Sequence, residues 1–411
     1  MSTTAEPDLL RSDDRGLWCA RGGFHIDPWR AAPVAVITHA HGDHATWGSG
    51  VYWCSAEGAG VLRRRVGANA DIRAVPWGQR VRLGDTDVSF HPAGHVLGSA
   101  QVRVEPVGGG PVWVASGDYK RDADPTCSPF EVVACDVFIT EATFAMPIYR
   151  WRETREVVDE IRAWWAGNAA EGKVSALFCY ALGKAQRLLA ELGGTALQSR
   201  REQTGGGAGG QPLPGPVFIH GSVRPLVDEY RVAGVALPET RLVTEEVAAG
   251  GVESVMDDGA PRAGAGGAGG AAGGDTPGSA THDGAVDAKP ARAKRRKRNA
   301  AEFAGALVVA PPSAAGSPWM RNFGAAERVE TAFASGWMRV RGVRRWRGYD
   351  RGFVLSDHAD WPGLIRTVRE TGASRVLATH GSVGVLSRYL REQGVEAQPL
   401  ATGYRAEAEE E

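Results

Sequence analysis

The segment "THAHGDH", Thr38–His44, constrains the fold of this chain more than any other feature. It places three histidines and an aspartate directly behind the apolar run "VAVI". Three more residues of the same types follow short apolar runs far along the chain: His95 in "HPAGH", Asp118 in "ASGDY" and His380 in "LATHGS". If these side chains act together, the beginning and the end of the chain must belong to one folded unit.

Imidazole and carboxylate groups are the ligand set of zinc and related divalent ions. His39 and His41 are two positions apart at a predicted strand end, so both side chains can face the same side and bind one metal. Asp43 and His44 can reach a second metal from the following turn, and Asp118 can bridge the two ions. Two such ions about 3.5–4 Å apart lower the pKa of a bound water and polarise the bond that is hydrolysed. The alternative is a polar loop with coincidental histidines.

Charge and cysteine content narrow the class of protein. The 411 residues carry a formal net charge of −1, so any surface that binds nucleic acid must be local. The five cysteines contain no CxxC pair, which favours free thiols in a reducing compartment. The N-terminus lacks an apolar signal segment, and no run approaches about 18 apolar residues. We therefore expect a cytoplasmic protein without a membrane segment.

The pattern along the chain predicts a mixed α/β (α+β) fold. Short apolar or alternating runs before residue 150 predict a β-rich part, for example "DVSFHPAGH" and "VFITEATF". From Arg150 onward, strand and helix patterns alternate, as in "KVSALFCYALGKAQRLLAEL". Residues 248–299 are rich in Gly and Ala, end in a basic run and cannot bury enough apolar surface to fold. The organisation is that of one domain split by an insertion.

These residues carry a family resemblance. "THAHGDH", "GHVLGSA", "SGDY" and the late "THG" resemble the signature of the metallo-β-lactamase fold, and "ITEATF" and "SDHAD" resemble its β-CASP branch of nucleases. "PPSAAGSPWMRNFG" and the stretch from "ASGWMRVRG" to "SDHADW" resemble the bacterial ligase-associated DNA exonuclease family. The resemblance implies an αββα sandwich, residues 1–150 and 351–411, interrupted by an α/β β-CASP domain, residues 151–350. The 248–299 segment departs from the family pattern.

The same resemblance assigns roles to individual residues. One metal would be held by His39, His41 and His95, the other by Asp43, His44 and His380, with Asp118 between them. Asp27 would orient the loop that carries the metal ligands without binding the metal itself. Asp43, Glu141 and His358 would be catalytic, with His358 protonating the leaving oxygen and Glu141 orienting it. The metals implied are two zinc ions, with manganese as an alternative.

Two segments are candidates for substrate binding. Gly183 and Lys184 lie at a predicted helix start, where backbone N–H groups suit a phosphate. Arg344 and Arg345 belong to the stretch "WMRVRGVRRWRGYDR", which is rich in basic and aromatic residues. This combination is typical of a surface that binds single-stranded nucleic acid. A solvated charged strand is the alternative for that stretch.

The expected function is a two-metal phosphodiesterase that cleaves DNA as an exonuclease in repair. The resemblance implies partnership with an ATP-dependent DNA ligase and a helicase. A ribonuclease of the same architecture is the nearest alternative, since His380 does not separate DNA from RNA. A small-molecule hydrolase lacks motifs like those around Glu141 and His358, and a non-catalytic scaffold would have lost ligands that are all present here.

Overall fold

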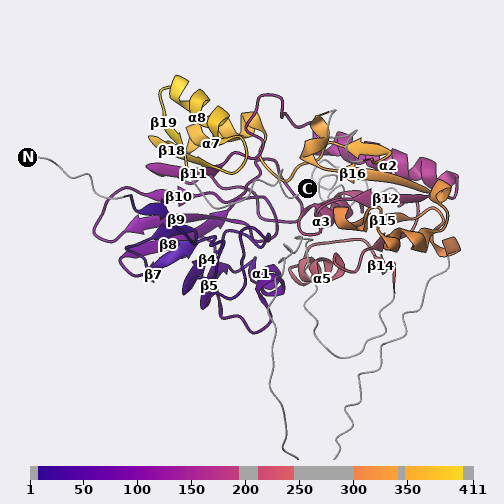
Figure 1. Cartoon of the computed structure of the whole chain (residues 1–411), viewed down its shortest axis with the longest axis horizontal. Coiled ribbons are helices and arrows are strands. Elements are labelled where there is room, and N and C mark those ends of the chain that lie inside the picture. Colours follow the sequence, from indigo (N-terminus) through magenta and orange to yellow (C-terminus); the bar gives the residue numbers. More distant parts are fainter. Residues whose placement is uncertain (1–7, 194–211, 245–299, 341–347, 401–411) are drawn as a thin grey trace, which may run out of the picture.

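The structure is a computed structural model that describes residues 8–193, 212–244, 300–340 and 348–400. The predicted 248–299 insertion, Arg344 and Arg345 lie outside these residues. Within them the chain forms three β-sheets together with α-helices and short 3₁₀ helices, so the prediction of a mixed α and β protein is confirmed. In Figure 1 two sheets lie on the left and the third on the right.

The first two sheets are built from both ends of the chain. The first has the order β1-β2-β3-β4-β5-β6 and the second the order β19-β18-β11-β10-β9-β8-β7. The strands of the first are β1 (Leu10–Ser12), β2 (Leu17–Cys19), β3 (Phe24–Ile26), β4 (Val34–Val36), β5 (Val51–Ser55) and β6 (Ile72–Val75). Those of the second are β7 (Val81–Leu83), β8 (Thr86–Pro92), β9 (Ala100–Pro106), β10 (Trp113–Ala115), β11 (Val137–Glu141), β18 (Arg375–Thr379) and β19 (Glu396–Pro399).

One apolar core joins these two sheets. Phe24 and Val36 of the first sheet belong to the same buried cluster as Phe90, Val102 and Ile139 of the second. Because alternate residues of a strand point to opposite faces, each strand can serve this core and also carry a second apolar set on its outer face. The two sheets therefore form a sandwich.

Helices cover both outer faces of the sandwich. Helices α7 (Trp361–Thr371) and α8 (Val383–Glu392) pack on the outer face of the second sheet, for example through Leu364 and Leu386. Helix α1 (Ala59–Val66) packs through Val61 and Leu62 on the first sheet. The layers thus run helix, sheet, sheet, helix.

The third sheet is formed wholly by strands that lie between β11 and β18 in the chain. Its order is β14-β13-β15-β12-β16-β17, and all its neighbouring strands are parallel. The strands are β12 (Val174–Phe178), β13 (Val217–Ile219), β14 (Arg241–Leu242), β15 (Leu307–Ala310), β16 (Val329–Ala334) and β17 (Arg351–Phe353). Strand β17 belongs to this sheet although it follows residue 350, the predicted boundary, and the division into domains remains a prediction.

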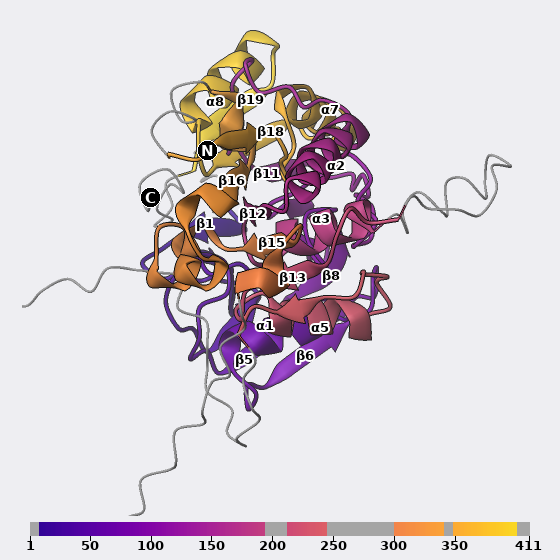
Figure 2. The ribbon, with the colours of Figure 1, turned by 90° about the vertical axis from the view of Figure 1, so that its right-hand side faces the viewer.

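Each face of the third sheet is covered. Three α-helices share one apolar core with it: α2 (Thr154–Ala170), α3 (Lys184–Leu192) and α5 (Arg224–Val232). Figure 2 shows these helices beside β12, β13 and β15. The other face meets residues of short 3₁₀ helices such as Phe303, Phe323 and Met338. These helices are η1 (Ala300–Phe303), η2 (Pro312–Ala314), η3 (Pro318–Phe323), η4 (Ala326–Arg328) and η5 (Gly336–Arg339).

The described residues contain no helix that is long and apolar enough to cross a membrane. The five cysteines are free thiols, and four of them are buried: Cys19, Cys54, Cys135 and Cys179.

A buried hydrogen bond between helix α5, which packs on the third sheet, and the sandwich generates a prediction. The buried Leu97 N–H donates to the hydroxyl of Tyr230 in α5 at 3.0 Å. We expect Tyr230→Phe to lower the free energy of unfolding by about 1–3 kcal/mol, because a buried N–H group is left without its acceptor. Urea unfolding followed by circular dichroism measures the change.

Tyr149→Phe is the matched control, since the Tyr149 hydroxyl makes no hydrogen bond within the described part of the chain and its removal should cost less than about 0.5 kcal/mol. Equal stability of the two variants would contradict the prediction.

Candidate metal centre

The predicted metal and catalytic residues lie at, or shortly after, the carboxyl ends of strands. Asp27 follows β3, residues 39–44 follow β4, His95 follows β8, Asp118 follows β10, Glu141 ends β11, His358 follows β17 and His380 follows β18. The structure brings three groups together, two of which share Asp118: His39, His41, His95 and Asp118; Asp43, His44 and His380; and Asp118, Glu141 and His358. Residues from both ends of the chain thus meet at one edge of the sandwich.

The prediction that His39 and His41 alternate at a strand end is wrong, because neither residue lies on a strand. Strand β4 ends at Val36, and both histidines belong to the following loop. A turn in which Ala45 N–H donates to the His41 carbonyl at 2.9 Å shapes this loop. The two rings meet because the loop curls, rather than because residues alternate along a strand.

In the first group three ring nitrogens converge. His41 Nδ1 lies 3.0 Å from His39 Nε2 and 3.1 Å from His95 Nε2. Asp118 Oδ2 lies 3.4 Å from His39 Nε2 and 3.8 Å from His95 Nε2. Four ligands around a tetrahedral zinc ion, with N–metal distances of about 2.0–2.1 Å, lie about 3.3 Å from one another. The spacing of these atoms fits such an ion.

The opposite nitrogens of two rings show which tautomer each carries. His95 Nδ1 lies 2.9 Å from the Asp357 carbonyl oxygen, and His41 Nε2 lies 3.3 Å from the Leu182 carbonyl oxygen. A carbonyl only accepts, so each of these nitrogens carries the proton and donates it. His95 Nε2 and His41 Nδ1 therefore present lone pairs to each other.

His39 is oriented through Thr38 and Asp27. The Thr38 hydroxyl donates its one proton to Asp27 Oδ2 at 2.5 Å, so it can only accept from His39 Nδ1 at 3.0 Å. The Thr38 N–H donates to the other oxygen of Asp27 at 2.7 Å. His39 Nε2 consequently also presents a lone pair, and three lone pairs point at one place. A cation at that place satisfies all of them.

The ring charges agree with this arrangement. Burial lowers the pKa of His41 to about 4, and burial followed by the neighbouring histidines lowers the pKa of His39 and His95 well below the ordinary value. All three rings are neutral at pH 7, which is the form that binds a metal.

The second group lies against the first. His44 donates from Nδ1 to Asp27 Oδ2 at 2.8 Å, and its Nε2 lies 3.5 Å from Asp43 Oδ2. The His380 ring stacks on the His44 ring, with centroids 5.1 Å apart. Burial opposes charging of His44, but the carboxylates of Asp43, Asp118 and Asp27 outweigh it and raise its pKa well above the ordinary value. Burial lowers the pKa of His380 to about 4.

Asp118 lies between the two groups. Its Oδ2 is 3.6 Å from His44 Nε2, in addition to the contacts with the first group. Its Oδ1 is buried and has no hydrogen-bond partner among the described residues. Burial raises the pKa of Asp118 to about 8, so strong positive charge beside it is needed for ionisation at neutral pH. The donor set therefore suits cations on both sides of this carboxylate.

Glu141 and His358 form a buried pair at the edge of the first group. His358 Nδ1 lies 2.9 Å from Glu141 Oε2, and the other oxygen of Glu141 accepts from Tyr119 N–H at 2.7 Å. Burial works against ionisation of Glu141, but the His358 ring and the hydrogen bonds outweigh it and lower its pKa. The His358 ring lies 4.6 Å from the His95 ring, between centroids.

Two site residues adopt a backbone conformation that L-residues rarely take. Asp27 has φ 43° and His380 has φ 59°. Among the described residues these are the only ones other than glycine with positive φ. Such strain costs roughly 1 kcal/mol or more per residue and persists where the surroundings hold it, typically at functional sites.

Gly183 and Lys184, predicted to bind substrate phosphate, lie at the start of α3. Gly183 is the N-cap of α3, as expected, but the N–H groups of Gly183, Lys184 and Ala185 all donate to protein oxygens. The Lys184 ammonium is buried 3.2 Å from Asp357 Oδ2. A phosphate at this helix start would have to displace these partners.

Several residues that shape the site carried no signal in the sequence. Leu182 and Asp357 act through backbone carbonyls, which any residue type offers. Thr38 precedes the first histidine and could have been identified only as a hydroxyl next to a ligand. Arg187 is fully buried in α3, where it donates to the Ser356 carbonyl at 2.8 Å. A buried arginine in an apolar helix face is the one detectable sign of this network.

Comparison with known proteins gives limited similarity. No family model matches the chain. The chain is 27% identical over 387 residues to a protein named "Probable DNA ligase" from Opitutus terrae, strain DSM 11246 / JCM 15787 / PB90-1. The match covers 93% of this chain but 30% of that protein, so the chain spans less than a third of its length.

Among solved structures, a protein of unknown function from Enterococcus faecalis V583 matches with a TM-score of 0.48 and 8% identity. That match covers 90% of this chain and 79% of the other. A likeness at this level does not assign a fold.

The hydrogen bonds that link Asp27, Thr38 and His39, called the Thr38 relay below, generate a prediction. We expect Thr38→Val to weaken zinc binding about 10- to 100-fold, because His39 is left without the acceptor that selects its tautomer. Titration of the protein with Zn²⁺ in competition with a chromogenic chelator measures the affinity. Thr46→Val, in the same loop, is the matched control, and equal zinc affinity of the two variants would show that the relay has no role.

Proposed function

We propose that the chain is a two-metal nuclease that hydrolyses phosphodiester bonds of DNA. The observation that carries this proposal is the convergence of His39 Nε2, His41 Nδ1 and His95 Nε2, which all present lone pairs, with His41 Nδ1 about 3 Å from each of the other two. Neutral imidazoles have no reason to converge in this way unless a cation lies among them.

The fold we propose is a metallo-β-lactamase sandwich interrupted by a β-CASP domain. Two facing sheets with helices on both outer faces support the first part, and a separate parallel sheet between β11 and β18 supports the second. We place the sandwich in residues 1–150 and 351–411 and the insertion in residues 151–350. Strand β17 follows residue 350 but belongs to the sheet of the insertion.

His39, His41 and His95 would hold one ion, Asp43, His44 and His380 the other, and Asp118 would contact both. When bound, two divalent ions, zinc or manganese, supply a water of lowered pKa and polarise the scissile phosphodiester. Asp27 holds His44 directly and His39 through Thr38, so one carboxylate fixes a ligand of each group. Asp43, half-buried beside His44, would contribute the most accessible carboxylate of the centre.

Glu141 and His358 would manage the proton of the leaving oxygen. An ionised Glu141 accepts the proton of His358 Nδ1 and stabilises the imidazolium form of the ring, in which the far nitrogen also carries a proton that can be donated. The Tyr119 N–H keeps the carboxylate in place at its other oxygen. Glu141 is therefore a positioning group and His358 the proton donor.

The choice of DNA as substrate rests on the name of the relative. A protein named as a DNA ligase contains a segment similar to nearly the whole of this chain, and more than two thirds of that protein lies outside the similarity. We propose that a nuclease of this kind acts beside ligation, with an ATP-dependent DNA ligase and a helicase as functional partners in the cytoplasm. Family resemblance of the motifs supports the same assignment.

The roles of the two histidine sets can be separated by mutation. We expect His39→Ala to abolish cleavage and lower the amount of bound metal. His358→Ala should slow cleavage by about 10²- to 10⁴-fold, the range of general acid catalysis, with metal content unchanged. Metal content measured by plasma mass spectrometry, together with single-turnover cleavage, tests both. His91→Ala is the control, since His91 pairs with Glu131 away from the centre, and loss of metal from the His358 variant would contradict the assigned role.

Substrate class is tested on purified protein with Zn²⁺ or Mn²⁺ and DNA and RNA of equal sequence, each labelled at the 5′ or the 3′ end. We expect cleavage of DNA, and the two labels report the direction of attack. Cleavage of RNA alone would replace the proposed function by RNA-end processing.

A further inference from the structure

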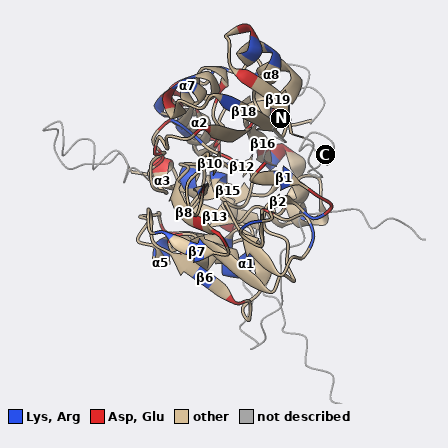
Figure 3. Cartoon of the chain, turned by 90° about the vertical axis from the view of Figure 1, so that its left-hand side faces the viewer, with Lys and Arg blue, Asp and Glu red and all other residues tan. Residues whose placement is uncertain are grey.

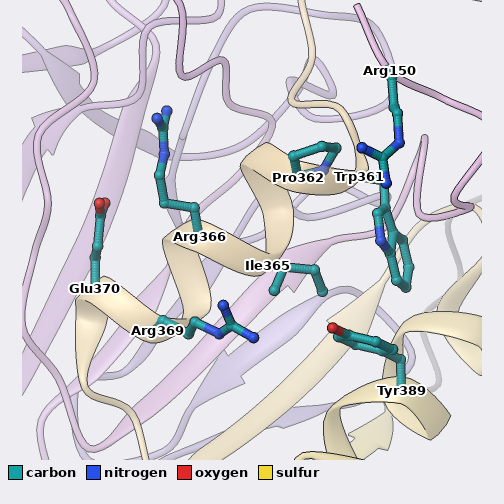
Figure 4. A pocket seen from close by; sticks show the side chains of 8 residues that line it. All are labelled: Arg150, Trp361, Pro362, Ile365, Arg366, Arg369, Glu370 and Tyr389. Atoms are coloured by element: carbon teal, nitrogen blue, oxygen red, sulfur yellow. The ribbon is translucent and has the colours of Figure 1, made fainter.

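A hollow on the surface beside the second sheet is lined by arginines and aromatic rings. It lies between α7, α8 and the segment around Arg150, and its volume is about 480 Å³. In Figure 4 the rings of Trp361 and Tyr389 lie on one side, Arg366 and Glu370 lie on the other, and Arg369 points between them. Arg150 enters above Trp361 from a different segment of the chain.

The hollow carries excess positive charge. Within the described part of the chain, the guanidinium groups of Arg150, Arg366 and Arg369 form no ion pair, although Arg150 Nε donates to the Pro147 carbonyl at 3.4 Å. The one acidic side chain in the lining, Glu370, is bound by Arg121 at 2.6 Å. Three like charges around one hollow repel each other, and an anion between them removes that repulsion.

This charge is a local feature. Figure 3 shows basic and acidic residues interspersed over α7 and α8, and the whole chain has a net charge of −1. The positive charge of the hollow therefore does not result from a generally basic surface. Its guanidinium groups offer the planar forks that match phosphate oxygens in pairs.

Aromatic groups give the hollow a second kind of contact. The Trp361 and Tyr389 rings pack edge to face, with centroids 4.9 Å apart. Trp361 is buried and Tyr389 is half-buried, so Tyr389 is the ring that a base can contact. Arginine next to aromatic side chains is the combination that binds phosphates and bases of a nucleic-acid strand.

The segments that line the hollow are tethered by hydrogen bonds to the segment that carries His358. The Trp151 indole N–H donates to the His358 carbonyl at 2.9 Å, and the Trp151 backbone N–H donates to Asp360 Oδ2 at 3.0 Å. Trp361 N–H donates to the Tyr149 carbonyl at 3.1 Å. Since Trp361 is the third residue after His358, their Cα atoms lie within about 11 Å of each other. A strand held at the metal centre can reach the hollow.

We propose that the hollow binds phosphates of the DNA strand outside the scissile bond, with Arg150 and Arg369 as the contacts. This inference rests on the proposed nuclease function, which it extends by naming where the strand continues. The hollow would then determine affinity for long substrates and leave the chemistry of the centre unchanged.

The test combines Arg150→Ala with Arg369→Ala and measures binding of a fluorescein-labelled single strand by anisotropy in EDTA over a series of salt concentrations. We expect weaker binding and a slope of log K against log salt that is shallower by about 1.4, at roughly 0.7 for each phosphate that the variant no longer neutralises. The control combines Arg73→Ala with Arg82→Ala, which removes equal charge from strands β6 and β7 at sheet edges, where both arginines are ion-paired. The control should keep the native slope.

Hydrolysis of bis(4-nitrophenyl) phosphate by the metal-loaded protein reports the centre independently, because this diester is too small to reach the hollow. We expect native turnover in the Arg150/Arg369 variant. Native DNA affinity and slope in that variant, or loss of its turnover of the small diester, would overturn the proposal. Binding of dTMP with the affinity of the strand would also overturn it and assign a mononucleotide site. If no diester is hydrolysed by any form, the nuclease function fails while anisotropy still decides whether the hollow binds DNA.

Discussion

The structure depends on one electrostatic constraint: three imidazole nitrogens present lone pairs toward one place, with His41 Nδ1 3.0 and 3.1 Å from the other two, and a positive charge among them relieves their repulsion. In each ring the opposite nitrogen donates a hydrogen bond that fixes the tautomer. His39 donates to Thr38, His41 to the Leu182 carbonyl and His95 to the Asp357 carbonyl. These three supports come from different parts of the chain, from the ligand loop itself, from the segment before α3 and from the segment after β17. The centre is therefore as much a product of tertiary structure as of the histidine motif.

The third sheet contributes to the centre without supplying a ligand to the first group. Asp357 is held between Lys184 Nζ and Arg187 Nη1, each 3.2 Å from one of its oxygens, and both basic residues belong to α3. Burial opposes ionisation of Asp357, but these two cations outweigh it and lower its pKa. Because the carbonyl of the same residue fixes His95, a displacement of α3 would change the orientation of a metal ligand. The parts of the molecule are thus coupled at a specific residue.

The residues alone predict a metal site, because histidine and aspartate at apolar strand ends are rare and chemically specific, and the resemblance implies which of them share an ion. The resemblance groups His39, His41 and His95 around one ion with Asp118 between the two ions, and the structure brings these four side chains together. The local reason was wrong, since the two histidines belong to a curled loop and not to a strand. Residues that act through backbone carbonyls could not be predicted, because residue type does not report on them. Lys184 was predicted as a phosphate ligand from its position at a helix start, but long-range packing placed its ammonium beside Asp357.

Strands β11 and β18 are hydrogen-bonded neighbours in the second sheet, although all residues from 142 to 374 lie between them in the chain. During synthesis, β11 must wait with one edge open until the entire third-sheet part has emerged. An open edge of apolar residues such as Phe138 and Ile139 is a template for pairing with another chain. Loop closure over such a distance also makes this pairing a late and slow event. The arrangement that unites the two ends of the chain at the metal centre therefore carries a vulnerability to aggregation that ends only when the C-terminal strands arrive.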